Sequence, residues 1–187
     1  MTTLVERIVD VCDHLDRAGL PWALGGALAL AYATEEPRAT RDIDVNVFVP
    51  ATEAARVFAA LPAGVRHGAA DVRAAEDDEQ VRLWWDDTPV DLFFAADPFH
   101  AEVARRCRAV PFAGRTIRVL SAEDLAVFKA MFDRPKDWVD IATMHESRSL
   151  DVGVAADRLA DLLGHDDPRI GRLRDVASTG NGTWSAR

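Results

Sequence analysis

Two aspartates separated by a single residue, Asp42 and Asp44, stand at the start of an apolar stretch of the chain. A β-branched residue at every second position from Ile43 to Val49 predicts a strand. Side chains alternate between the two faces of a strand, so both carboxylates point to the same side. Two such carboxylates repel each other unless a cation relieves them, and Mg²⁺ prefers oxygen ligands of this kind. The pair predicts a metal site, with solvated acids that pair with Arg38 or Arg41 as the alternative.

A double glycine precedes this strand and has the setting of a phosphate-binding turn. Gly25 and Gly26 follow a short predicted strand, Trp22–Leu24, and precede a predicted helix, Leu28–Thr34. Glycine lets backbone N–H groups approach a ligand closely, and a helix N-terminus favours anions. The glycines therefore predict contact with a phosphate, with a tight turn that binds nothing as the alternative.

A third acid, Asp91, lies in a second apolar run, Val90–Phe94, which also predicts a strand. This strand can lie beside the one that carries Asp42 and Asp44, and the Asp91 carboxylate then faces the same metal ions. Three acids on neighbouring strands suit a two-metal phosphoryl transfer.

The remaining elements follow from hydrophobic periodicity and turn residues. We expect an α/β (α+β) fold, in which helices flank a mixed β-sheet. Residues 1–120 form the core, residues 121–177 a helical portion packed on that core, and residues 178–187 a flexible tail. The other predicted helices are Leu4–Leu15, Ala54–Leu61, Ser121–Met131, Lys136–His145, Val154–Leu163 and Ile170–Val176, and two hairpins pair Gln80–Trp85 with Val90–Phe94 and Ala109–Phe112 with Thr116–Leu120.

The composition is that of a soluble protein, with 49% hydrophobic and 28% charged residues. No apolar run approaches the roughly 18 residues of a membrane helix. The N-terminus lacks the pattern of a secretion signal, so we expect a cytoplasmic protein without a membrane partner. Cys12 and Cys107 are expected to be reduced thiols, and the five histidines show no metal-ligand spacing. Trp84 and Trp85 face opposite sides of their strand, so one is expected in the core while the other can stack on a nucleobase.

At the level of whole motifs, the chain resembles the nucleotidyltransferase superfamily with the DNA polymerase β-like fold. Within that superfamily it is most similar to the minimal AbiEii-type and MenT-type toxins of toxin–antitoxin pairs. The resemblance covers roughly residues 20 to 145 and rests on Gly25-Gly26, Arg38-Ala-Thr40-Arg41-Asp42-Ile-Asp44-Val, Val90-Asp91-Leu, Leu120-Ser-Ala-Glu-Asp-Leu125, Lys129, Arg134-Pro-Lys136-Asp137 and Asp140-Ile141.

This resemblance implies a role for each of the motif residues. Asp42 and Asp44 would hold two Mg²⁺ ions, Asp91 would complete the metal site and help to activate the attacking hydroxyl, and Gly25 with Gly26 would cradle a nucleoside triphosphate. Residues 1–120 would be the nucleotidyltransferase catalytic core. Many relatives have Gly-Ser where this chain has Gly26, so a hydroxyl contact to the triphosphate is missing here.

A second group of residues follows in the helical part. Lys129 is implied to act in catalysis by neutralising charge on the triphosphate as the transition state develops. It is one of only two lysines in a chain whose other basic residues are arginines, which favours a function over a solvated surface role. The nucleotide is further implied to contact residues from both parts of the motif, namely Arg38, Thr40, Arg41, Lys136 and Asp137. Lys136 has the alternative of being simply solvated.

The predicted reaction moves a nucleoside monophosphate from a nucleoside triphosphate (NTP) to an acceptor, and the toxin resemblance implies tRNA as acceptor and a cognate antitoxin as partner. The net charge of −9 excludes a protein that grips nucleic acid over its whole surface. RNA would have to meet a local basic strip, for which the candidates are Arg105, Arg106, Arg108, Arg115 and Arg118.

Two other functions remain open. One is transfer to a small molecule, as in aminoglycoside- and lincosamide-modifying relatives; the acidic cluster Glu76, Asp77, Asp78 and Glu79 could attract a cationic drug, although a solvated loop is the alternative. The other is a catalytically silent module that retains the fold and the nucleotide pocket. The complete set of three acids argues against that second possibility.

Overall fold

The computed structural model describes residues 2–178, which divide into two units. Unit 1 contains the described residues up to Leu28 together with Arg38–Leu120. Unit 2 contains Ala29–Pro37 and the described residues from Ser121 onward. The tail predicted for residues 178–187 lies outside the described residues, apart from Ser178 at the end of the last helix.

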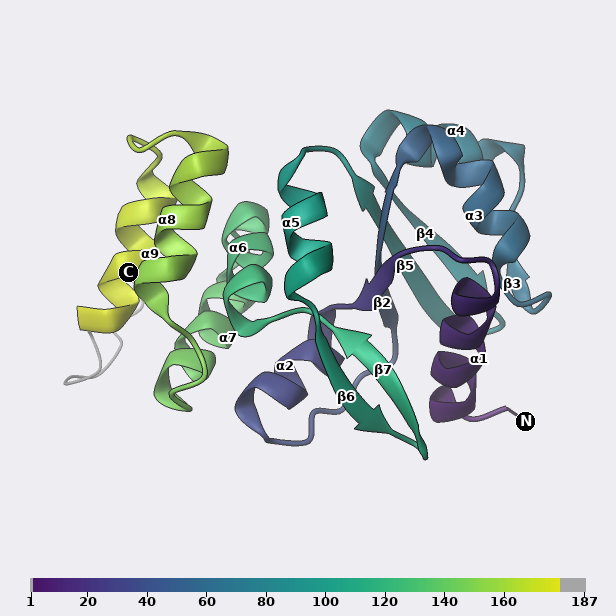
Figure 1. Ribbon diagram of the computed structural model, residues 1–187, viewed down its shortest axis with the longest axis horizontal. Helices are drawn as coiled ribbons and strands as arrows, with labels where there is room; N and C mark the ends of the chain where they lie inside the picture. Colours follow the sequence, from purple (N-terminus) through teal and green to yellow (C-terminus); the bar gives the residue numbers. More distant parts are fainter. Residues whose placement is uncertain (1, 179–187) are drawn as a thin grey trace. The chain divides into compact units, whose positions relative to one another are not determined.

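Unit 1 is built on a seven-stranded mixed sheet (Figure 1). Its strands are β1 (Trp22–Leu24), β2 (Ile43–Pro50), β3 (Val65–Arg66), β4 (Gln80–Trp85), β5 (Thr88–Ala95), β6 (Arg108–Phe112) and β7 (Arg115–Val119). They are arranged in the order β3-β4-β5-β2-β1-β7-β6. Strand β2 is antiparallel to β1 and parallel to β5, and it lies inside the sheet with Val45 and Val47 fully buried. The β-branched residues thus anchor the strand that begins just after Asp42.

The helices of unit 1 connect these strands. They are α1 (Leu4–Arg17), α3 (Ala54–Ala60) after the 3-10 turn η1 (Ala51–Glu53), α4 (Ala69–Asp78) and α5 (Phe99–Arg106), and α2 (Gly26–Thr34) begins in unit 1 and continues into unit 2. A capping box fixes the start of α1, because the Thr3 hydroxyl accepts the Glu6 N–H and the Glu6 carboxylate accepts the Thr3 N–H. Cys12 of this helix is buried, which raises its pKa to about 12, so the thiol stays protonated at neutral pH.

Helix α1 is tied to the β4–β5 hairpin by one buried arginine. The Arg7 side chain donates to the Trp85 carbonyl oxygen at 2.9 Å and to the Thr88 hydroxyl at 2.5 Å. It also forms ion pairs with Asp86 and Asp87 in the hairpin turn. Because this hairpin carries Asp91 on its second strand, Arg7 helps to fix the position of a predicted metal ligand.

Replacement of Arg7 by alanine is expected to destabilise the protein by about 2 kcal/mol or more, because the buried Trp85 carbonyl and Thr88 hydroxyl lose their donor. Denaturant unfolding measures this effect. Arg17→Ala, at an exposed position of the same helix, is the matched control and should cost less than about 1 kcal/mol. Equal losses in the two variants would contradict the structural role of Arg7.

Unit 2 is helical, as expected for this part of the chain. Besides most of α2 it contains α6 (Ala122–Phe132), α7 (Pro135–Glu146), α8 (Val152–Leu163) and α9 (Pro168–Ser178). Side chains cap two of these helices, because Ser121 accepts the Asp124 N–H and Asp151 accepts the Val154 N–H. None of the helices among residues 2–178 has the length and apolar character that a membrane crossing requires.

The α/β fold class with a mixed sheet is confirmed, and every predicted helix and both hairpins are present within a few residues of their expected bounds. The sequence pattern did not indicate α4 or α5. The acidic cluster Glu76–Glu79, for which a solvated loop was the alternative to a drug-attracting site, ends α4 and leads into β4. Helix α4 is rich in alanine and acidic residues and buries only Ala75 fully, so it carries little apolar periodicity to read.

Candidate active site

The three predicted acids of unit 1, called the acid triad below, lie together at one end of β2 and β5. Asp44 on β2 is directly opposite Asp91 on β5, and Asp42 immediately precedes β2. One carboxylate oxygen from each residue lies within 4.8 Å of those of the other two. The parallel pairing of these strands therefore places the three side chains as the sequence pattern predicted.

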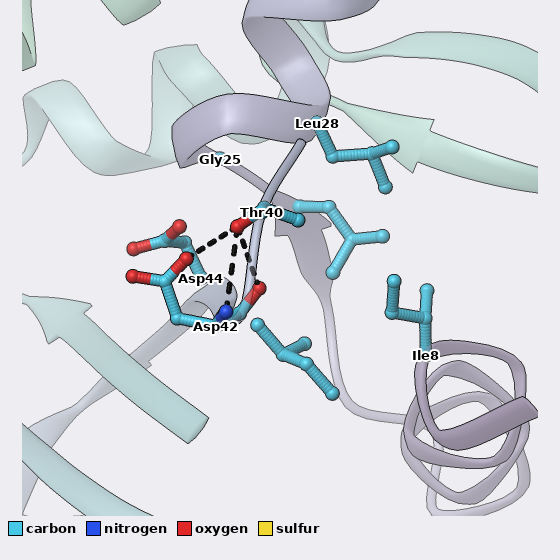
Figure 2. Close-up of a pocket in the computed structure, with 8 residues that line it drawn as sticks. Ile8, Gly25, Leu28, Thr40, Asp42 and Asp44 are labelled. Atoms are coloured by element: carbon cyan, nitrogen blue, oxygen red, sulfur yellow. Dashed lines mark hydrogen bonds between the residues drawn. The ribbon is translucent and has the colours of Figure 1, made fainter. Parts of the chain in front are cut away.

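Neighbouring groups hold the carboxylates of Asp42 and Asp91. The Thr40 hydroxyl donates to Asp42 Oδ1 at 2.5 Å and accepts the Asp42 N–H at 3.3 Å, as Figure 2 shows. The Asp91 carboxylate accepts two hydrogen bonds from Arg82, with Nε and Nη2 each 2.7 Å from a different oxygen. Arg38 and Arg41, offered as alternative partners of the acids, are exposed in the segment before β2.

Arg82 is the residue of this site that the sequence did not predict. It lies directly opposite Asp91 in the β4–β5 hairpin, and its side chain is 54% exposed. The hydrogen bonds and the charge of Asp91, with smaller contributions from Asp42 and Asp44, raise the pKa of Arg82 above its ordinary value. Counting pairs outward from the Asp86–Asp87 turn would have identified it, since the turn length sets the register of a hairpin.

Both residues of the double glycine lie against Asp44. The Gly25 N–H donates to the main-chain carbonyl of Asp44 at 2.9 Å, so this donor belongs to the pairing of β1 with β2. Gly26 has a φ of +50°, and a Cβ atom there would lie 1.8 Å from Asp44 Oδ2. A side chain at position 26 and the observed position of the Asp44 carboxylate therefore exclude each other.

A pocket of unit 1 opens beside these residues (Figure 2). One side is formed by Asp42, Asp44 and Thr40, and the other by apolar residues that include Leu28 and Ile8. The complete lining is Ile8, Leu24, Gly25, Leu28, Thr40, Asp42, Ile43 and Asp44. The polar and apolar residues of this pocket lie on opposite sides of it, and in Figure 2 the Asp42 and Asp44 carboxylates are directed away from Leu28 and Ile8.

Gly26→Ala is expected to weaken the binding of divalent metal at least tenfold, because the added methyl group displaces the Asp44 carboxylate. Titration with Mn²⁺ monitored by electron paramagnetic resonance measures this directly. Gly19→Ala is a matched control, since Gly19 also has a positive φ but has no atom within 4 Å of an added Cβ. Both variants are expected to be destabilised by about 1 kcal/mol, because alanine is strained in the left-handed backbone conformation. Only Gly26→Ala should lose metal affinity.

The predicted residues of the helical part form a separate charged cluster in unit 2. The Lys129 ammonium donates to Asp140 at 2.7 Å and lies 3.6 Å from Asp137, whose side chain is fully buried. Arg134 donates to both oxygens of Asp137, which also accepts the Arg134 N–H at the start of α7. Burial raises the pKa of Asp137, but the Arg134 hydrogen bonds and the charges of Lys129 and Arg134 outweigh it and hold the pKa below its usual value. Lys136, in contrast, is exposed.

The lowered pKa of Asp137 predicts a pH-dependent contribution to stability. A carboxylate with a depressed pKa stabilises the folded state above its unfolded pKa of about 3.9, and this stabilisation disappears as the pH falls through the lower folded value. Arg134→Gln should therefore lower the melting temperature at pH 7, and its difference from wild type should shrink below pH 4. Lys136→Gln, two residues away and exposed, should show neither effect. A difference for Arg134→Gln that does not change with pH would exclude this ion pair as its cause.

The basic strip proposed from the sequence is largely compensated by acids. Arg115 pairs with Asp13 and Asp16, and both Arg105 and Arg106 pair with Glu102. Arg105, Arg108 and Arg118 are the exposed members of the predicted strip. A polyanion would therefore find less charge there than the sequence suggests.

The mixed sheet with an acid triad at the adjacent strands β2 and β5 is the arrangement expected for the nucleotidyltransferase class. The chain is 22% identical to ANT(2'')-Ia in a crystal structure with adenylyl-2''-tobramycin, with a TM-score of 0.54 over 93% of this chain and 98% of that one. A solution structure of the same antibiotic-resistance factor gives 19% identity and a TM-score of 0.54 over 95% and 92% of the two chains. An antigenic nucleotidyltransferase-like protein from Paracoccidioides brasiliensis gives 14% identity and a TM-score of 0.52 over 91% and 90%. These likenesses show the fold.

The family follows from the sequence itself. Residues 13–181 match the family described as nucleotidyl transferase AbiEii toxin, type IV toxin–antitoxin system, and the chain belongs to that family. No curated protein matches it in sequence. The chain is therefore a nucleotidyltransferase, and the resemblance stated from its motifs is confirmed.

Proposed function

We propose that the protein transfers a nucleoside monophosphate from an NTP to an RNA acceptor, with tRNA as the favoured acceptor, in a reaction that depends on Mg²⁺. The observation that carries this proposal is the acid triad, in which three carboxylates approach within 4.8 Å beside a glycine turn and a half-apolar pocket. Membership in a toxin family supports nucleotidyl transfer as the activity and a cognate antitoxin as the partner.

The donor set fits a hard divalent cation. Asp42, Asp44 and Asp91 each offer a carboxylate oxygen, and three anionic oxygens this close to one another suit Mg²⁺ far better than any protein cation alone. When bound, Mg²⁺ supplies neutralisation of the triphosphate and polarisation of the phosphorus that is attacked. The triad would hold it, and Thr40 keeps the Asp42 carboxylate in place.

The chain's own groups then account for the rest of the reaction. The first N–H groups of α2, from Gly26 to Leu28, have no acceptor within the helix and would donate to the triphosphate. Asp91 would orient the acceptor hydroxyl, whose oxygen attacks the α-phosphate while pyrophosphate leaves. For Arg38, Arg41, Lys129 and Lys136 the proposed contact with the nucleotide rests on the family resemblance.

In unit 2, the ion pairs around Lys129 suggest different roles for Lys129 and Asp137. Asp137 is fully buried, so it would act by holding Lys129 and Arg134 rather than by touching a ligand. These ion pairs would hold the Lys129 ammonium group in a fixed position. This assigns Asp137 a positioning role within the proposed function.

A second candidate is transfer to a small molecule. The observation in its favour is the fold shared with ANT(2'')-Ia, whose crystal structure holds adenylyl-2''-tobramycin. The acidic cluster Glu76–Glu79 does not strengthen it, because these residues end α4 and are not among those that line the pocket at the acid triad. A catalytically silent module is disfavoured by the intact triad.

Incubation with radiolabelled NTPs, Mg²⁺ and either bulk tRNA or a panel of aminoglycosides tests the proposal. Wild type should label tRNA, and Asp44→Asn should lower the rate at least ~100-fold because one metal ligand is lost. Asp77→Asn, an exposed acid on α4, is the matched control and should retain full activity. Label on an aminoglycoside alone would favour the second candidate, and label on neither acceptor, with Asp44→Asn unchanged from wild type, would favour the silent module.

A further inference from the structure

The open face of strands β3 and β4 carries an exposed tryptophan between arginines, next to the acid triad. Along β4, Leu83 and Trp85 are buried, whereas Arg82 and Trp84 are exposed. Trp84 is 42% exposed and Trp85 only 9%. Because Arg82 reaches Asp91 on this open face, Trp84, two residues further along the strand, lies on the face of the sheet that bears the triad.

The strand register fixes how these side chains are arranged. Arg82 is opposite Asp91, and Trp84 is opposite Pro89 on one side and Arg66 on the other. Adjacent strands are about 4.8 Å apart, and residues two apart along a strand are separated by about 6.7 Å. Trp84 therefore lies one row of the sheet, roughly 7 Å, from the Arg82–Asp91 ion pair, with Arg66 directly beside it.

Arg66 places an exposed positive charge beside Trp84. Arg66 is exposed, and its Nη2 donates to the main-chain carbonyl of Asp86 at 3.2 Å, a neutral acceptor that leaves the guanidinium charge in place. The carboxylates of the nearby turn, Asp86 and Asp87, are both bound by Arg7. In a chain with a net charge of −9, the exposed Arg66 guanidinium beside Trp84 is a group that can pair with one phosphate of an RNA.

The strand order separates this surface from the glycine turn. The turn follows β1, and the order β1-β2-β5-β4 puts the two acid-bearing strands between it and Trp84. If the triphosphate lies at the glycine turn, the reacting acceptor must approach from the opposite side of the triad. Arg66 and Trp84 lie on that side.

We propose that Arg66 and Trp84 form an acceptor platform, on which the single-stranded end of the RNA acceptor lies before transfer. A terminal base would stack on the Trp84 indole, and the adjacent phosphate would pair with the Arg66 guanidinium. Stacking on an exposed aromatic and pairing with arginine are the contacts by which proteins hold single-stranded RNA. The platform rests on the proposed function, since it requires an RNA acceptor for the transfer reaction.

Fluorescence anisotropy with labelled bulk tRNA, together with equilibrium dialysis of labelled NTP, tests the platform. Trp84→Ala should weaken tRNA binding about 5-fold or more while NTP affinity stays unchanged, and Trp84→Phe should restore most of the tRNA affinity. Arg66→Gln should lower the slope of log affinity against log salt by about 0.7, the value for one contact to a single-stranded phosphate. Arg56→Gln, an exposed arginine on α3 that pairs with Glu53, should leave the slope unchanged.

The outcomes also separate this proposal from the function on which it rests. Wild type that labels tRNA, with Trp84→Ala binding tRNA equally well, would overturn the platform and leave the transfer reaction intact. The platform is equally overturned if Trp84→Ala loses affinity for NTP and tRNA by the same factor, since Trp84 would then serve the nucleotide. Label on an aminoglycoside and not on tRNA would remove the platform but keep nucleotidyl transfer. No label on any acceptor would remove both.

Discussion

Mutual repulsion between three carboxylates within 4.8 Å is the constraint on which this structure depends. Each neighbour of the triad either lowers that repulsion or prevents the acids from moving apart. Arg82 brings a positive charge next to Asp91 and donates two hydrogen bonds to it. The Thr40 hydroxyl donates to the Asp42 carboxylate. Gly26 has no side chain and so leaves the space that the Asp44 carboxylate fills. The parallel pairing of β2 and β5 then keeps Asp44 and Asp91 opposite each other. Binding of a cation would relieve the repulsion that remains between the three carboxylates.

The sequence predicted the parts of this arrangement that are local in the chain. Alternation in β2 placed Asp42 and Asp44 on one face, and the second apolar run placed Asp91 on a strand beside them. Arg82 was missed because its importance depends on the register of a hairpin, which periodicity alone does not supply. For Gly26 the residue was recognised but not its contact with Asp44, because that contact joins segments far apart in the sequence. Helices α4 and α5 escaped prediction because neither has a broad apolar face, with Ala75 and Val103 as their only fully buried residues.

The ion cluster of unit 2 shows a different use of charge. Asp137 is fully buried, and taking such a carboxylate out of water is costly unless several partners compensate it. Arg134 and Lys129 do so, and Asp140 binds the Lys129 ammonium from the other side. Lys129 is thereby 8% exposed, with a restricted set of positions, unlike the solvated Lys136 nearby. The Lys129 side chain is thus restricted by its ion pairs, whereas the exposed Lys136 side chain can take many positions.

The parallel pairing of β2 and β5 has a consequence for how the protein can diversify. Parallel neighbours need a crossover connection, and here that connection is residues 51–87, from η1 to the turn after β4. It begins after Asp44 and ends before Asp91, so it contains Arg66, Arg82 and Trp84 but none of the triad. This one continuous stretch of the chain holds Asp91 through Arg82, so a change within β4 also affects the metal ligands, whereas the rest of the stretch makes no contact with the triad that the strand pairing requires. The residues proposed to bind the acceptor therefore belong to a different stretch of the chain from the three acids.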